Sequence, residues 1–139
     1  MHPNLIKLRW LVFFSLLLVV PLGLFSKTYN GPGDRWLNHF GGGVIYEIFW
    51  CLFFFGLFPG KKSISLIPLW VFAITALLEL LQLWQPPFLQ TLRATWLGRT
   101  LLGTTFSAWD FPHYLLGCAI ASLWLRLIWQ TAGSRDRPR

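Results

Sequence analysis

The sequence predicts an all-α membrane protein with four transmembrane helices and a short re-entrant or interfacial helix between the third and fourth. Its composition is the first reason: 55% of the 139 residues are hydrophobic and 12% are charged, about half the charged fraction of a typical soluble domain. The second reason is that the apolar residues fall into four runs separated by polar segments. Such runs cross lipid as helices, because a helix bonds all its backbone groups internally. We expect one polytopic domain over residues 1–139.

The first predicted helix covers residues 10–25 and is preceded by Lys7 and Arg9. A basic start and a short apolar run are also typical of a signal peptide. However, the run ends in Leu24-Phe25-Ser26-Lys27, which lacks the small-x-small pattern of a cleavage site. We therefore predict a retained helix whose outer end is kinked by Pro21.

The other three predicted helices cover residues 37–58, 64–84 and 111–129, and a polar tail follows at 133–139. At a rise of 1.5 Å per residue they are about 28–33 Å long, which matches the hydrocarbon core of a bilayer. Residues 86–109 are too apolar for a free loop and too polar to span. One helical face there carries Phe88, Leu89, Leu92 and Trp96, so we predict a re-entrant or interfacial helix broken by Gly98 and Gly103.

The charges predict the orientation. Twelve Lys and Arg against five Asp and Glu give a net charge of +7, and the apolar composition argues against nucleic acid as the partner. With the N-terminus inside, the cytoplasmic side holds Lys7, Arg9, Lys61, Lys62, Arg126, Arg135, Arg137 and Arg139. The other side holds only Lys27, Arg35, Arg93 and Arg99. The positive-inside rule therefore places both termini in the cytoplasm, with membrane lipids as the first partners.

Ionisable residues inside spans are costly, and each is a candidate functional residue. Glu79 shares a polar stripe with Thr75 and Gln82 on the third predicted helix. A carboxylate there needs a proton or a cation, and the nearby cations on its side are Arg93 and Arg99. We expect residues 86–109 to fold back so that an arginine pairs with Glu79. The candidate polar cluster is Glu79, Gln82, Arg93, Thr95, Arg99, Asp110 and Tyr114.

Asp34, His39 and Glu47 are secondary candidates, and we expect Glu47 to be neutral or hydrogen-bonded to a neighbouring helix. His39 and Cys51 lie on its helix face but roughly 18 Å apart, too far for one metal ion. We predict no metal, cofactor or catalytic residue. Asp110 before Pro112 is typical of a helix N-terminus. Cys51 and Cys118 are interpreted as packing residues, and Gly117 with Ala121 as a small-residue helix contact.

These residues resemble a bacterial family of small membrane proteins of unknown function that is related to the VanZ-like superfamily. The resemblance covers residues 33–120 and rests on Gly33-Asp34, Glu79-Leu80-Leu81-Gln82, Pro87, Leu92-Arg93-Ala94-Thr95, Gly98, Leu102-Gly103, Phe106, Asp110, Tyr114 and Gly117. It implies a bacterial inner membrane protein. One VanZ-like member is associated with resistance to a glycopeptide antibiotic, which implies a role at the cell envelope.

Three functions remain open from the sequence. The first is a non-enzymatic protein whose outer polar cluster binds a lipid head group or another anionic envelope compound, because arginine suits bidentate anion contacts. The second is a structural subunit, or a homo-oligomer, whose charges only hold the helices together. The third is a membrane-embedded enzyme with Glu79 or Asp110 as acid or base; no nucleophile is evident for it.

Overall fold

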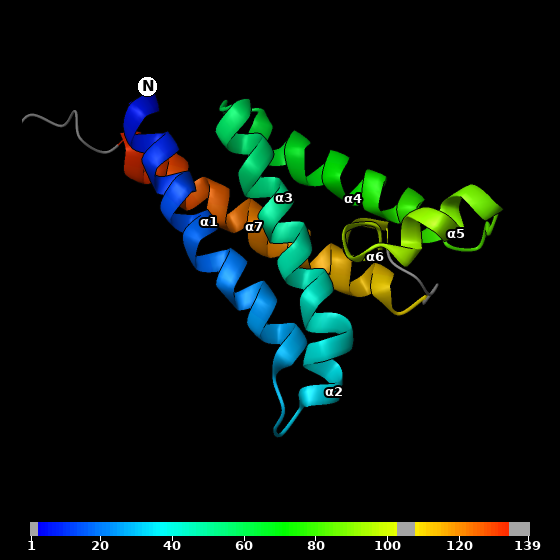
Figure 1. The fold of residues 1–139 in the computed structure, drawn as a ribbon. Coiled ribbons are helices and arrows are strands. Elements are labelled where there is room, and N and C mark those ends of the chain that lie inside the picture. The colour runs from blue at the N-terminus through cyan, green and yellow to red at the C-terminus, as the bar shows by residue number, and fades with distance from the viewer. Residues whose placement is uncertain (1–2, 103–107, 134–139) are drawn as a thin grey trace, which may run out of the picture.

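The computed structural model describes residues 3–102 and 108–133, and within these ranges the chain is helical and has no strand. Figure 1 shows the helices as a bundle with one arm that projects from it. In chain order they are α1 (Leu5–Thr28), α2 (Asp34–Trp36), the π-helix η1 (Leu37–Gly41), α3 (Gly42–Leu57), α4 (Ser63–Leu81), α5 (Pro87–Ala94), α6 (Trp96–Leu102) and α7 (Asp110–Gly133).

Within the described ranges, three helices are long and apolar enough to cross a membrane: α1, α4 and α7. They contain most of the first, third and fourth predicted spans. Helix α1 begins earlier than predicted because the Asn4 side chain accepts hydrogen bonds from the N–H groups of Ile6 and Lys7 and so caps the first turn. It also continues through Pro21 to Thr28.

The structure differs from the prediction in the second span, residues 37–58. Its α-helix, α3, has 16 residues and is about 24 Å long, shorter than a hydrocarbon core. The turn before it is the π-helix η1, which inserts one residue into the helical repeat. Since Leu37 and Gly42 both keep right-handed helical angles, the chain is nevertheless helical without interruption from Asp34 to Leu57.

Residues 87–102 form two short helices in place of the one predicted, and they make up the arm in Figure 1. The break lies at Thr95, whose backbone is extended (φ −79°, ψ 152°), so the prediction of a break at Gly98 is wrong. The Thr95 hydroxyl accepts a hydrogen bond from the Gly98 N–H and thereby starts α6. A Cβ at Gly98 would overlap the Leu92 carbonyl, so glycine serves tight packing there. Gly103 lies outside the described residues.

The arm exposes an apolar face, as the sequence predicts for an interfacial helix. Phe88, Leu92 and Trp96 are exposed, whereas Leu89 is buried against the rest of the chain. Insertion of this segment into the bilayer stays a prediction.

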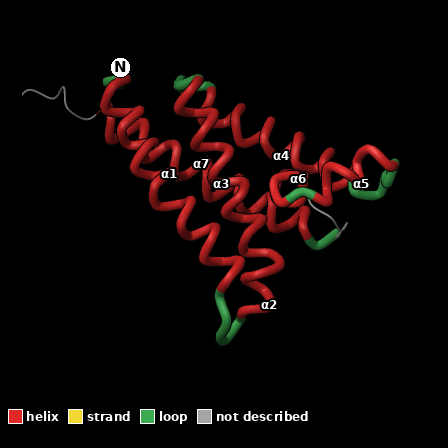
Figure 2. The backbone as a smooth tube through the Cα atoms, in the orientation of Figure 1, coloured by secondary structure: helices red, strands yellow, loops and turns green. Residues whose placement is uncertain are grey.

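The core lies where α3 packs between α1 and α7, and α4 packs against both α7 and α3. Figure 2 shows these long helices crossing one another at moderate angles. The closest approach is at Gly117 of α7, where an added Cβ would lie 2.7 Å from the Val44 carbonyl oxygen and 2.8 Å from Cβ of Glu47. Ala121, one turn further, is fully buried. The structure thus confirms the helix contact predicted at Gly117 and Ala121.

The start of α1 and the end of α7 lie side by side (Figure 1). The Asn4 N–H donates to the Ala132 carbonyl (3.2 Å), and the Lys7 ammonium donates to the Thr131 carbonyl (2.9 Å). The last carbonyls of a helix have no partner within the helix, so α1 satisfies two of them. Both ends of the described chain therefore lie at the same end of the bundle.

Candidate functional site

Three residues of the predicted cluster come together between α4 and α7. Glu79 is 1% exposed, and its Oε2 accepts a hydrogen bond of 2.9 Å from the Tyr114 hydroxyl. The half-buried Asp110 begins α7 within hydrogen-bonding reach of Glu79. We call Glu79, Asp110 and Tyr114 the outer acidic cluster.

A lysine that the sequence analysis did not include in the candidate polar cluster lies beside the outer acidic cluster. Lys27, in the last turn of α1, is close enough to Asp110 to interact electrostatically. Its ammonium lies 3.1 Å from where a Cβ of Gly42 would be, and the Tyr114 ring lies 3.1 Å from that of Gly43. The two glycines therefore make room for the lysine and the tyrosine. The sequence could have indicated this neighbour, because Lys27 follows the first predicted span on the same side of the membrane as Asp110.

Arg93 does not pair with Glu79 as the sequence analysis expects. Its guanidinium is 6% exposed and donates to the carbonyls of Trp84 (3.2 Å) and Leu81 (3.1 Å). Leu81 is the last residue of α4, and Trp84 follows the turn after it. The guanidinium therefore lies at the negative end of the helix dipole. The Glu79 carboxyl receives the Tyr114 hydroxyl instead. Arg93 thus fixes the arm to the end of α4.

The remaining members of the predicted cluster are spread over the arm and its junction. Gln82 is buried at the end of α4, Thr95 caps α6, and Arg99 is exposed on α6. The structure therefore gathers carboxyl groups at the outer cluster and leaves the two arginines outside it. The anion-binding hypothesis requires a cluster of positive charges. The described residues do not form one.

A second polar group lies deeper, where α3 meets α7. Glu47 is fully buried, and its Oε2 accepts a hydrogen bond of 3.0 Å from the Cys118 thiol. The structure confirms the expected bond to a neighbouring helix, and it corrects the interpretation of Cys118 as a packing residue only. The Thr75 hydroxyl lies beside this carboxyl but donates to carbonyls of its own helix. The Oε1 atom of Glu47 has no hydrogen-bond partner among the described residues.

Comparison with known families decides where this chain belongs. The model of a family described as "Protein of unknown function (DUF2809)" matches residues 33–118. The chain belongs to this family. The DUF2809 match includes Glu47, Glu79, Asp110, Tyr114 and Cys118, so both polar groups lie within the family region, whereas Lys27 precedes it. Searches of the curated proteins and of the solved structures found no match.

Of the two remaining secondary candidates of this DUF2809 protein, the structure describes the side chain of Asp34 only. Asp34 begins α2 and accepts a hydrogen bond from the Arg35 N–H, which is a local helix-start contact. The side chain of His39 lies outside what the structure describes. Among the described side chains, no three His, Cys, Asp or Glu residues converge in a way that could hold a metal ion.

Helix α2 and the start of α7 are joined through His113. Nε2 of His113 accepts a hydrogen bond of 3.2 Å from the Trp36 indole. The indole only donates, so the ring proton is on Nδ1, which donates to the Trp109 carbonyl (2.7 Å). His113 thus ties α2 to the start of α7, next to Asp110.

Proposed function

We propose that this DUF2809 protein binds a zwitterionic lipid head group at its outer acidic cluster. The observation that carries the proposal is the pair of carboxyl groups of Asp110 and Glu79, with Lys27 beside it. A head group that carries a primary ammonium and a phosphate complements this set of charges. The ammonium donates to Asp110, and the phosphate accepts from Lys27, as charge-assisted hydrogen bonds are the strong ones.

The burial of the two carboxyl groups gives them different parts in the proposal. Asp110 is half-buried and meets the ligand. Glu79 is 1% exposed, so it acts through Asp110 and through Tyr114, which it holds by a 2.9 Å hydrogen bond. This version keeps the predicted lipid partner. It replaces recognition of an anion by two arginines with recognition of an ammonium by carboxyl groups, because the described carboxyl groups converge and the arginines do not.

We further propose that the chain crosses the membrane four times, with the continuous helical stretch from residue 34 to residue 57 as the second crossing. An even number of crossings puts both ends of the chain on one side of the membrane. This agrees with the contact between the start of α1 and the end of α7. The predominance of basic residues at that side favours the cytoplasm. The outer acidic cluster then faces the outer leaflet of a bacterial inner membrane, which agrees with the VanZ-like resemblance and its link to the cell envelope.

The test compares two lipids that differ only in the head group. The full chain in detergent is titrated with phosphatidylethanolamine or phosphatidylcholine of equal acyl chains, and retained lipid is counted by native mass spectrometry. We expect phosphatidylethanolamine to bind about tenfold more tightly, which corresponds to about 1.4 kcal/mol, because choline has no N–H to donate. Asp110→Asn should abolish this preference.

Asp34→Asn is the matched control, since it removes a carboxylate that makes a local contact outside the cluster. It should leave the preference for phosphatidylethanolamine unchanged. Equal retention of both lipids by the unmodified chain, or equal effects of Asp110→Asn and Asp34→Asn, would refute the proposal.

A structural role is the second candidate, and the burial of Glu79 favours it. The hydrogen bonds from Tyr114 to Glu79 and from Cys118 to Glu47 join α7 to α4 and to α3. The carboxyl groups would then serve only helix packing, either in a single copy of the chain or in a homo-oligomer. In that case Tyr114→Phe and Asp110→Asn lower thermal stability without altering the preference between the two lipids.

A further inference from the structure

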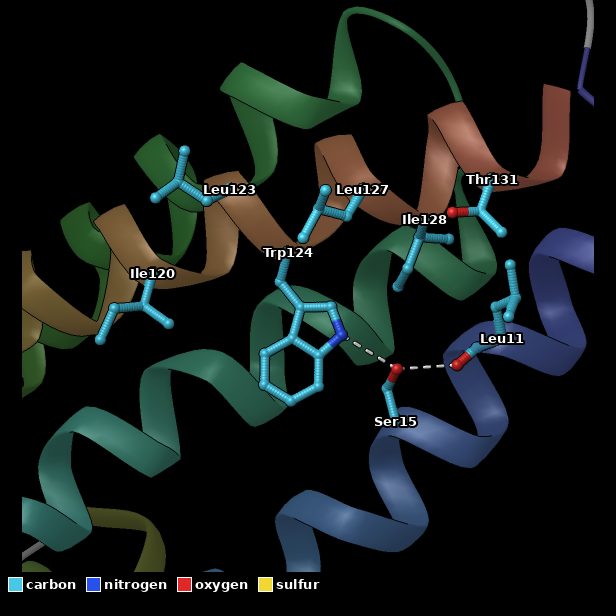
Figure 3. A pocket seen from close by; sticks show the side chains of 8 residues that line it. All are labelled: Leu11, Ser15, Ile120, Leu123, Trp124, Leu127, Ile128 and Thr131. Atoms are coloured by element: carbon cyan, nitrogen blue, oxygen red, sulfur yellow. Dashed lines mark hydrogen bonds between the residues drawn. The ribbon is translucent and has the colours of Figure 1, made fainter. Parts of the chain in front are cut away.

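A groove runs along α7 beside α1, far from the outer acidic cluster. Its volume is about 400 Å³. Figure 3 shows Ile120, Leu127 and Thr131 of α7 along its length and Leu11 and Ser15 of α1 at its side. Leu127 is 62% exposed, so this face of α7 is not covered by another helix of the described chain.

The groove is one leaflet deep. Eleven residue positions separate Ile120 from Thr131 along α7, which corresponds to about 16 Å at the helical rise. The hydrocarbon core of a bilayer is about 30 Å thick, so one leaflet contributes about half of it. Thr131 lies in the last turns of α7, which ends at Gly133. The groove therefore begins near the membrane surface where the chain ends lie and stops near the bilayer centre.

The walls of the groove suit a hydrocarbon chain. The polar groups within it bond to one another: the Trp124 indole donates to the Ser15 hydroxyl (3.0 Å), which donates to the Leu11 carbonyl (2.8 Å). Figure 3 shows this pair of hydrogen bonds at the floor of the groove. With these groups satisfied, an apolar occupant leaves no buried polar group without a partner.

The surface end of the groove carries a positive charge. Lys7 lies one turn before Leu11 on the same face of α1, and its ammonium donates to the Thr131 carbonyl (2.9 Å). An ammonium has three N–H groups, and one is used by this contact. A phosphate placed beside Thr131 can accept from another.

We propose that the groove between α1 and α7 binds an anionic phospholipid of the leaflet at which both chain ends lie. One acyl chain occupies the groove from Thr131 to Ile120, and the phosphate accepts a hydrogen bond from Lys7. This site is independent of the outer acidic cluster, which lies at the opposite end of the bundle and for which a different head group is proposed.

The test uses the full chain in detergent, with phosphatidylglycerol as the anionic probe and phosphatidylcholine of equal acyl chains as the neutral one. Native mass spectrometry should show that the unmodified chain retains phosphatidylglycerol preferentially. Lys7→Gln should weaken phosphatidylglycerol binding about tenfold, the effect of one charged hydrogen bond. It should weaken phosphatidylcholine binding less, because the choline cation offsets the phosphate charge that attracts Lys7. Lys7→Arg should preserve the preference, which separates loss of charge from loss of the contact between α1 and α7.

Two controls are matched to the groove. Arg126→Gln removes an exposed positive charge of α7 outside the groove and should leave phosphatidylglycerol binding unchanged. Leu127→Trp fills the groove and should weaken the binding of both lipids. Leu77→Trp, on the similarly exposed face of α4, should leave the binding of both unchanged.

Equal retention of the two lipids by the unmodified chain would overturn the proposal, as would equal effects of Lys7→Gln and Arg126→Gln. A Leu127→Cys variant that cross-links two copies, in a chain that purifies as a lipid-free dimer, would assign the groove to a second copy and also overturn it. The preference for phosphatidylethanolamine, measured in Lys7→Gln, should persist. Failure here is therefore distinguishable from failure of the proposed function.

Discussion

Replacing Gly117 by alanine tests the contact on which the arrangement of α3 and α7 depends. The added Cβ would lie 2.7 Å from the Val44 carbonyl oxygen and 2.8 Å from Cβ of Glu47. Cβ contacts below 3.0 Å essentially do not occur in proteins, so the two helices must separate by at least 0.3 Å at this point. One of the two obstructing atoms belongs to the backbone of α3, which cannot turn away as a side chain can.

Two opposing effects set the magnitude. Overpacking a close contact costs about 1–3 kcal/mol, whereas glycine to alanine within a helix stabilises by about 0.5–1 kcal/mol. Because the obstruction is partly backbone, we expect a cost near the upper limit and a net loss of about 2 kcal/mol in the free energy of unfolding. The separation also lengthens the 3.0 Å hydrogen bond between Cys118 and Glu47.

The assay is equilibrium unfolding of the full chain in detergent, followed by circular dichroism. Gly133→Ala is the matched control, because a Cβ at that position of α7 has no atom within 4 Å. It should leave the free energy of unfolding unchanged or raise it. A Gly117→Ala variant as stable as Gly133→Ala would refute the close contact between α3 and α7.

Three further changes test local contacts, two by the same unfolding assay and one by amide hydrogen exchange. Asn4→Ala removes the acceptor of two N–H groups at the start of α1 and should cost about 1 kcal/mol; Asn4→Asp, which keeps an acceptor, should cost little. Arg93→Ala leaves the Trp84 carbonyl without its donor and should speed amide hydrogen exchange throughout α5, while an unchanged exchange rate would contradict the anchoring. Cys118→Ala leaves the buried Glu47 carboxyl without its donor and should cost about 1–3 kcal/mol; Cys118→Ser should restore most of it, and equal losses would show that the thiol serves packing only.

The apolar runs of the sequence were enough to find α1, α4 and α7, because lipid-facing helices need an unbroken apolar stretch and little else. Their ends were harder to predict. Helix α1 starts before its apolar run because of the Asn4 side chain, a local hydrogen bond that hydropathy does not register. The second span contains the π-helix η1, whose register depends on what packs around it and not on a distinctive residue pattern.

For the site as well, sequence spacing indicates some of the residues, whereas their hydrogen-bond partners depend on tertiary packing. Glu79, Asp110 and Tyr114 could be predicted as a group, since burying a carboxyl group requires a polar neighbour. The partner of Arg93 could not, because the carbonyls at and just after the end of α4 compete with Glu79 for the same guanidinium. Cys118 was missed for a related reason: a thiol in an apolar run looks like a packing residue until the carboxyl group facing it on α3 is known.

Helix α7 links these features, because different faces of it serve the two ends of the bundle. Asp110, Tyr114 and Cys118 recur every four residues and face α3 and α4 in its first half. In its second half, Leu125 and Ala132 continue that face as buried apolar residues, while another face, with Ile120, Leu127 and Thr131, lines the groove. Ionisable groups are less costly near the head groups than at the bilayer centre, and the hydrogen bonds that α7 donates to the buried Glu79 and Glu47 lie in the half that holds Asp110. The head-group proposal therefore belongs to one end of α7 and the acyl-chain proposal to the other, with Gly117 fixing the helix between them.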